Sequence, residues 1–243
     1  MTQKKVNNKI KKILLVGYPS SGLISTFATS YVVHTLKMNQ IGEIDHPDLL
    51  PTLFVENGEI LEPIRIYNKE NLFVILSDIP FEPYVASDFA EMVLNYCKGQ
   101  KIDMIVMVSG LEALNNPPAS PKVYGLITHR SLEKMLYENQ ISKFLAGSIY
   151  GTEAKLISRF RKSGMPTLVI YAECHPFFPD PSAAINAITS LSKVLKIKLD
   201  TQDIKNKMET LRIQHRNLMQ ETLNALKQQQ EKHPKPKVPQ IYK

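Results

Sequence analysis

The sequence is poor in the residues that build disulfide and metal sites. Its two cysteines, Cys97 and Cys174, stand far apart without a C-x-x-C pair, so we expect neither a disulfide framework nor a zinc site. The six histidines lack the H-x₃-H and H-E-x-x-H spacings that place two ligands on one metal. We therefore expect two reduced thiols in or near the core, and no bound metal.

Long apolar runs are also missing. The longest, such as "ILLVGY" at 13–18, are far below the ~18 residues that a membrane span requires. Lysines precede this first run, as in a signal peptide, but the run is short and no A-x-A cleavage site follows it. We expect an intracellular, cytoplasmic protein that has no membrane partner.

The usual nucleotide and hydrolase motifs are absent from the first strand-to-helix turn, "GYPSSG" at 17–22. It has no G-x-G-x-x-G spacing, and Leu23 stands where the lysine of G-x-x-x-x-G-K-[ST] would be. Ser20 and Ser21 lack the G-x-S-x-G pattern of hydrolases. We expect a tight turn that lets strand and helix pack closely, and no cofactor.

Two further stretches contain reactive side chains but no recognisable catalytic set. The loop at 109–125 follows an apolar strand and holds one carboxylate, Glu112, for which the sequence identifies no partner, although Glu153 and Glu173 lie near the ends of other strands. Cys174 and His175 are adjacent on a strand, so their side chains point to opposite faces. We expect no catalytic residues.

Positive charge is in excess but is concentrated at the two ends. The chain has 30 Lys and Arg against 23 Asp and Glu, a net charge of +7, with clusters at 4–12 and from Lys227 onward. No central helix or loop interleaves arginine with aromatic residues as a nucleic-acid site would. We expect solvated basic ends that suit an acidic protein surface, and no nucleic-acid partner.

The body alternates strand and helix patterns. Strands are expected at 13–17, 41–46, 52–60, 61–78, 101–110, 122–129, 142–151 and 166–174, with hairpin turns at 57–58 and 68–71; helices are expected at 23–38, 84–98, 130–139, 152–163 and 182–197. Such alternation predicts an α/β fold, a three-layer sandwich whose mixed, mainly parallel sheet has helices on both faces. The core domain is expected to span 12–198, after a basic segment at 1–11.

The end of the chain differs from the body. Apolar residues at a 4-3-4-3 spacing predict a long amphipathic helix within 199–231, which packs either on its own sheet or against another subunit. Prolines at 234, 236 and 239 predict an extended, flexible tail at 232–243. This tail finishes with an aliphatic residue, a tyrosine and a lysine: Ile241, Tyr242 and Lys243.

An ordered series of short motifs resembles one family. A strand that ends in G-[YF]-P-x-x-G, the stretch "VSGLEA" in a middle strand and loop, "SIYG" closing a later strand and "DPSAA" opening a helix resemble the archaeal proteasome-assembly-chaperone family across about 12–197. The chain departs from the family at Ser20 and Ser21, where many relatives are richer in Gly and Val, which puts any ligand-binding property of that loop in doubt.

The resemblance implies an α/β sandwich similar to purine nucleoside phosphorylase, used without established catalysis, and homo-oligomers such as tetramers or pentamers. It implies a proteasome core particle partner. Some members carry a C-terminal hydrophobic–tyrosine–any-residue motif that docks between α-subunits of the end ring and assists assembly or gate opening. Ile241, Tyr242 and Lys243 match this motif position by position.

The chemistry of such docking is sound on general grounds. Ile241 would fill an apolar niche, Tyr242 would combine ring burial with a hydroxyl hydrogen bond, and the carboxylate of Lys243 would pair with a lysine of the receptor. The sequence thus predicts a non-enzymatic assembly chaperone or activator that binds the proteasome α-ring. The alternatives are a phosphorylase or hydrolase that uses the loops after the strands at 13–17 and 104–108, and a nucleic-acid-binding protein.

Overall fold

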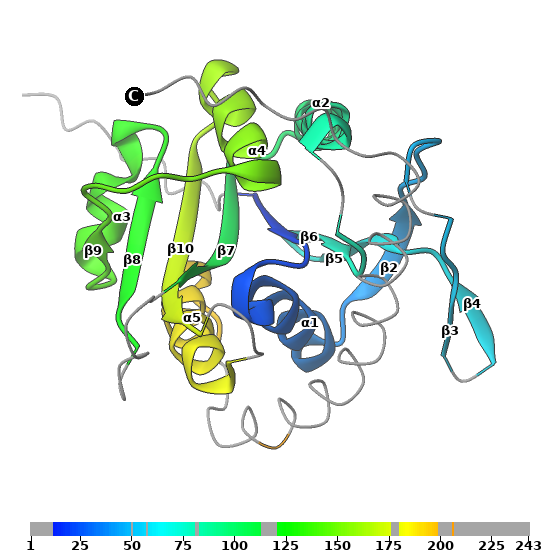
Figure 1. Ribbon diagram of the computed structural model, residues 1–243, viewed down its shortest axis with the longest axis horizontal. Coiled ribbons are helices and arrows are strands. Elements are labelled where there is room, and N and C mark those ends of the chain that lie inside the picture. The colour runs from blue at the N-terminus through cyan, green and yellow to red at the C-terminus, as the bar shows by residue number, and fades with distance from the viewer. Residues whose placement is uncertain are drawn as a thin grey trace, which may run out of the picture.

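The protein is built on one eight-stranded sheet (Figure 1). The computed structural model describes residues 12–49, 51–56, 58–80, 83–112, 121–175, 180–198 and 206. In spatial order the strands are β2 (Asn39–Glu43), β5 (Ile64–Lys69), β6 (Leu72–Ser77), β1 (Ile13–Gly17), β7 (Met104–Glu112), β10 (Thr167–Cys174), β8 (Val123–Ile127) and β9 (Ser142–Lys143). A separate hairpin consists of β3 (Phe54–Glu56) and β4 (Glu59–Leu61).

The middle of the sheet is parallel and its flanks are mixed. β1 pairs in parallel with both β6 and β7, and β7 pairs in parallel with β10. β5 pairs antiparallel with both β2 and β6, and β8 pairs antiparallel with β10. The central strands are apolar nearly throughout, because helices cover both of their faces and leave no side exposed to water.

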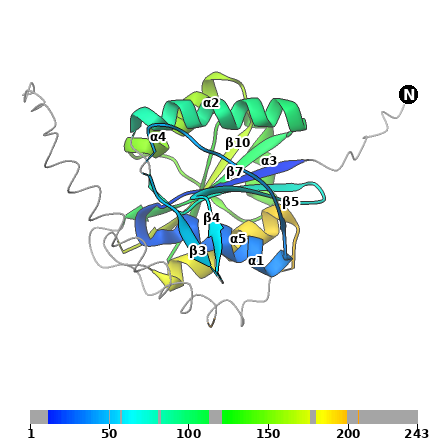
Figure 2. The same cartoon turned by 90° about the vertical axis from the view of Figure 1, so that its right-hand side faces the viewer.

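Four helices form the outer layers, as the edge-on view shows (Figure 2). α1 (Ile24–Leu36) and α5 (Pro181–Leu195) pack on one face, and α2 (Pro83–Gln100) and α4 (Gly151–Lys162) pack on the other. Alternate residues of β1 supply the two cores, Leu15 to the first and Leu14 and Val16 to the second. Short elements η1 (Ser21–Leu23), η2 (Arg130–Leu132) and α3 (Glu133–Glu138) complete the described structure.

This architecture confirms the expected α/β class and its mixed, mainly parallel sheet between two helical layers. Both hairpin turns lie where the sequence places them, and Gly58 adopts the left-handed φ of +85° that a tight turn there requires. Cys97 and Cys174 are both buried and unpaired, as expected. No helix in the part of the chain described here is long and apolar enough to cross a membrane.

The strand expected at 142–151 is wrong for most of its length. Only Ser142 and Lys143 pair with β8 as a strand, and the backbone N–H of Phe144 adds one hydrogen bond of 2.9 Å to the Gly125 carbonyl oxygen. The chain then leaves the edge as coil, crosses in front of β8 and β10 and enters α4 (Figure 1), so "SIYG" precedes a helix and closes no strand. Phe144 turns inward, and its ring lies 5.4 Å from that of Tyr171 between centroids. Contact with the interior therefore outweighs the strand-like composition of this segment.

Candidate functional site

The predicted binding residues Ile241, Tyr242 and Lys243 lie outside the described residues. The same holds for the expected helix at 199–231, of which only Asn206 is described, and for the basic segment at 1–11. The tail motif, the role of the helix and the four-part division of the chain therefore stay predictions. The described residues do form a second candidate site, at the carboxyl ends of the central strands.

The turn after β1 packs tightly against the end of β7. The Ser21 hydroxyl donates a hydrogen bond of 2.7 Å to Glu112 Oε1, across 91 residues of sequence. Gly110 makes this approach possible, because a Cβ there would lie 2.3 Å from the Ser21 carbonyl oxygen and 2.5 Å from Cys174 Sγ. The expected tight turn is confirmed, and the structure gives Glu112 the partner that the sequence could not identify.

A half-buried carboxylate, Glu153, lies beside this contact in the first turn of α4. The Ser109 hydroxyl donates to Glu153 Oε2 over 2.7 Å, and the Tyr171 hydroxyl donates to Oε1. The Tyr18 hydroxyl faces the same carboxylate. Burial raises the pKa of Glu153 above its ordinary value, although the hydroxyls that bond to it favour the ionised form.

These groups open into a pocket of about 350 Å³. Its walls combine the two carboxylates with hydroxyl, aromatic and aliphatic groups: Ser21, Gly110, Leu111, Glu112, Phe144, Ser148, Ile149, Tyr150, Glu153 and Tyr171. β1 has β6 on one side and β7 on the other, so the chain reverses direction across the sheet at this point. Ligands of open α/β sheets bind in such a crevice, beyond the carboxyl ends of the strands.

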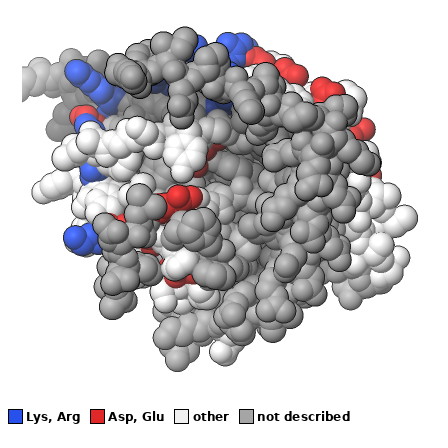
Figure 3. Space-filling model, in the orientation of Figure 1, with Lys and Arg blue, Asp and Glu red and all other residues white. Residues whose placement is uncertain are grey.

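Charged side chains are unevenly distributed on this side of the molecule. In the space-filling view, described acidic side chains appear near the centre and along the upper right rim, whereas described lysine and arginine side chains lie toward the left and upper rim (Figure 3). The pocket walls given above contain no lysine, arginine or histidine. Among the described residues, the pocket therefore offers no side-chain cation to a phosphate or carboxylate ligand.

The cysteine near the pocket, Cys174, is not an activated nucleophile. Burial raises the pKa of Cys174 to about 12, with the Asp180 and Glu112 charges adding to the effect, so its thiol stays protonated at neutral pH. The neighbouring His175 donates its backbone N–H to Asp180 Oδ2 at the start of α5, over 3.1 Å. The described residues contain no group of three or more His, Cys, Asp or Glu that could hold a metal ion.

Sequence reasoning missed the aromatic members of the pocket. Tyr171 reads as one more apolar strand residue, and Phe144 and Tyr150 lie in the segment that we expected to be a strand. Strand alternation could have indicated Tyr171, because it lies on the same face of β10 as Val169, which contacts the α2 and α4 layer. Phe144 and Tyr150 depend on the path of a coil, which no periodic pattern encodes.

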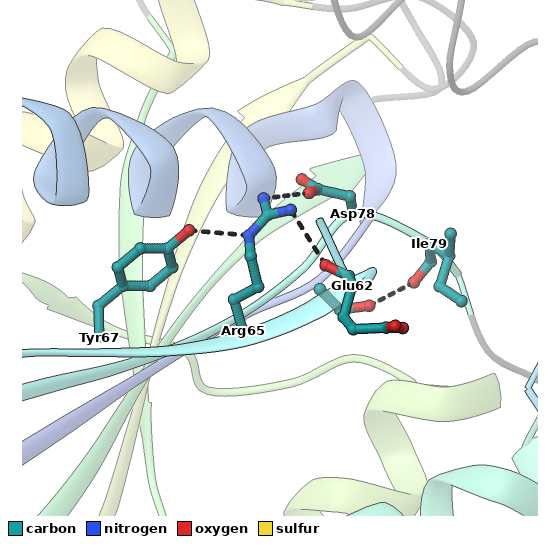
Figure 4. A network of polar contacts seen from close by, with 6 residues as sticks. Glu62, Arg65, Tyr67, Asp78 and Ile79 are labelled. Atoms are coloured by element: carbon teal, nitrogen blue, oxygen red, sulfur yellow. Dashed lines mark hydrogen bonds and ion pairs between the residues drawn. The ribbon is translucent and has the colours of Figure 1, made fainter. Parts of the chain in front are cut away.

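A second buried polar group lies elsewhere in the sheet and is closed to ligands by its own partners (Figure 4). Arg65 on β5 forms an ion pair with Asp78 after β6. Its Nε donates to the Tyr67 hydroxyl over 2.8 Å, and its guanidinium also donates to the Glu62 carbonyl oxygen over 3.1 Å. Each charge in this group has an opposite charge or a hydrogen bond, so the group ties β5 to the end of β6.

Known structures share this architecture. PbaA of Pyrococcus furiosus, an archaeal homolog of proteasome-assembly chaperone, is 24% identical with a TM-score of 0.80, and the match covers 88% of this chain and 95% of PbaA. PbaB of the same organism, an archaeal proteasome activator, is 18% identical with a TM-score of 0.71, and the match covers 86% of this chain and 94% of PbaB. At these identities the likeness establishes the fold alone.

Sequence comparison agrees with the structural one. An uncharacterized protein of Methanocaldococcus jannaschii is 23% identical over 214 residues, which cover 85% of this chain and 88% of that protein. The model of the PAC2 family matches residues 14–219, from the second residue of β1 through β10 and α5, and so includes both helical layers and the pocket described above. By that match, the chain belongs to the PAC2 family.

Proposed function

We propose that the protein is a cytoplasmic, non-enzymatic proteasome assembly chaperone or activator that acts as a homo-oligomer. Membership of the PAC2 family over residues 14–219 is the observation that carries the proposal. The shared fold with a proteasome-assembly chaperone homolog and with a proteasome activator supports it. The terminal sequence Ile241-Tyr242-Lys243 supplies a chemically suitable binding element.

In this proposal the four parts of the chain have separate tasks. The core at 12–198 presents the helix at 199–231, the tail at 232–243 reaches the core particle, and the basic segment at 1–11 stays solvated. About 10 extended residues span about 30 Å, and prolines in the tail lower the entropy lost on binding. Ile241 and Tyr242 then enter a pocket between neighbouring α-subunits, where the carboxylate of Lys243 pairs with a lysine.

Self-association makes so short a contact effective. Three residues bind weakly on their own, whereas several identical tails on one oligomer bind the same ring at a high effective concentration. The expected gain in avidity is a factor of ~10² or more. A tetramer or pentamer supplies enough tails, and the amphipathic helix at 199–231 is a suitable element for pairing between subunits.

The proposal is tested by removing the tail motif from the full chain. Deletion of residues 241–243, or Tyr242→Ala, should abolish co-sedimentation with the 20S-type core particle while the oligomer stays intact. Tyr137→Ala is a matched control, because Tyr137 is an exposed tyrosine of the body at 86% of its accessible surface. Undiminished binding by both tail variants would overturn the proposal.

The alternative of a phosphorylase or hydrolase has less support. The turn after β1 and the end of β7 do line a pocket with two carboxylates, Glu112 and Glu153, which is the observation in its favour. The described walls of the same pocket contain no cation for phosphate, and the hydroxyls of Ser21 and Ser109 donate to carboxylates, Glu112 and Glu153. A gain in melting temperature with inosine plus phosphate, absent with chloride, would favour the enzyme over the chaperone.

A further inference from the structure

The pocket at the carboxyl ends of β1, β7 and β10 has an imbalance of charge. Glu112 and Glu153 both line it, and the described wall residues include no lysine, arginine or histidine. Glu153 makes no ion pair with any described residue, and its hydrogen bonds come from neutral hydroxyls. Even partial burial of a carboxylate without a cation among the described residues is unfavourable, because charges are costly to remove from water.

Both carboxylates retain capacity to accept hydrogen bonds. An ionised carboxylate offers about four acceptor positions. Glu153 accepts from Ser109 and Tyr171 with Tyr18 close by, and the described residues give Glu112 one donor, the Ser21 hydroxyl. A ligand that enters between the two glutamates could therefore donate hydrogen bonds to their unused acceptor positions.

The remaining walls suit the apolar part of such a ligand. Phe144 and Tyr171 lie with ring centroids 5.4 Å apart and a 35° angle between ring planes, and Tyr150 stands at the rim with 74% of its surface exposed. Leu111 and Ile149 add aliphatic surface. Aromatic faces attract organic cations, and a pocket of about 350 Å³ is within the size range of small-molecule sites.

We propose that this pocket binds a small organic cation, with its ammonium or guanidinium group between Glu112 and Glu153 and an apolar portion against Phe144 and Tyr150. The ligand supplies the positive charge that the described wall residues do not. The same charge arrangement rejects phosphates and carboxylates. This inference is argued without the proposed role of the tail, because the described residues that line the pocket lie between Ser21 and Tyr171.

A purely structural role for Glu153 is the competing explanation. In that case the carboxylate only fixes the first turn of α4 to β7 and β10 through its hydroxyl partners, and the pocket has no preference among ligands. The two explanations differ in what they predict for Glu112, which is exposed and supplies one of the two carboxylates of the pocket. Neutralising Glu112 should weaken binding of a cation only if the pocket is a binding site. Binding measurements can therefore separate them without unfolding the protein.

The test uses the full chain and two cationic probes, tyramine and agmatine, in isothermal titration calorimetry. Tyrosol and para-hydroxyphenylacetate are the neutral and anionic counterparts of tyramine, and inorganic phosphate is a further control. We expect at least one cationic probe to bind with a Kd of ~1 mM or tighter, and each of the other three compounds at least about tenfold more weakly. Equal binding of tyrosol and tyramine, or no heat from either cation up to ~10 mM, would overturn the proposal.

Variants then locate the binding. Glu112→Gln should weaken the cationic probe about tenfold, and Glu153→Gln should do so by at least as much. Glu173→Gln is the matched control, because Glu173 also accepts from a tyrosine hydroxyl, that of Tyr124 at 3.0 Å, yet does not line the pocket. Unchanged affinity in Glu112→Gln, or an equal loss in Glu173→Gln, would refute the assignment. Since Glu112 is exposed, this outcome does not depend on how Glu153→Gln folds.

Discussion

Two polar groups of the sheet differ in how their charge is balanced among the described residues. Between β5 and β6, Arg65 and Asp78 are 9% and 6% exposed, and each is the other's counter-ion. At the carboxyl ends of β7 and β10, Glu153 is held by neutral hydroxyls and faces a second carboxylate, Glu112, across an open pocket. In the first group the two charges balance each other, whereas the described residues give the second group no cation.

This difference separates a structural use of charge from a functional one. A buried ion pair is costly to break, and its two charges balance each other without a ligand. A carboxylate kept without a cation is costly to keep, and such unbalanced groups gather at binding sites more often than in structural positions. Four substitutions test whether the two groups really differ in this way.

The largest effect is expected at the balanced group. Arg65→Met leaves the Asp78 carboxylate buried without its cation, and removal of one partner of a buried pair costs about 3–5 kcal/mol of the free energy of unfolding. Urea denaturation measures the loss. Arg159→Met is the control, since it removes an exposed ion pair with Glu91 and should leave the unfolding midpoint nearly unchanged. Equal midpoints for the two variants would show that the Arg65 pair is not structural.

The next effect concerns the wall of the pocket. Gly110→Ala would place a Cβ 2.3 Å from the Ser21 carbonyl oxygen, so the turn after β1 must move away from β7. We expect a loss of about 1–3 kcal/mol in the free energy of unfolding, as in other overpacked positions. Gly99→Ala on α2 meets nothing within 4 Å and should instead add about 0.5–1 kcal/mol. A neutral Gly110→Ala would contradict the close approach.

Removal of one hydroxyl from Glu153 tests how the carboxylate is held. Tyr171→Phe keeps the ring but deletes a donor to Glu153, and the loss of one partner of a buried polar group costs about 1–3 kcal/mol. Thermal unfolding by circular dichroism measures the change. Tyr124→Phe, which deletes the corresponding donor to the less enclosed Glu173, should cost less. A larger loss of stability in Tyr124→Phe than in Tyr171→Phe would show that the contact at Glu173 is the more stabilising one.

The smallest effect has the opposite sign. Glu153→Gln should raise the melting temperature slightly at neutral pH, because burial raises the pKa of Glu153 in the folded state above its ordinary value of 4.5. The folded protein then binds this proton more tightly than the unfolded chain, so ionisation lowers stability as the pH rises through the window above 4.5. The gain of the Gln variant should vanish below that window. A melting temperature that falls at neutral pH would show that the charge serves the fold.

The sequence predicted the body well because its cores are periodic. Alternating strands, helical spacing and turn residues such as Asn57-Gly58 are local signals, and nearly every one of them matches an element. The coil at 144–150 was not predicted, because its composition favours a strand. In the structure Phe144 instead packs against Tyr171.

The pocket could be predicted only in pieces. The sequence indicates Glu112 and the turn at 17–22 as separate features at strand ends. Their contact joins residues 91 positions apart and depends on strand order. Glu153 appears in the sequence as an ordinary acidic residue in the first turn of a helix, where the helix dipole favours negative charge. Its burial follows from the packing of α4 on β10, which no local pattern specifies.

The proposed role of the protein as a whole is tested most directly by native mass spectrometry of the full chain, alone and mixed with proteasome α-subunits. We predict a homo-oligomer of four or five copies that forms a defined complex with the α-subunits, and loss of that complex, but not of the oligomer, when residues 241–243 are deleted. A monomer that forms no complex, or a complex that survives the deletion unchanged, would contradict the account.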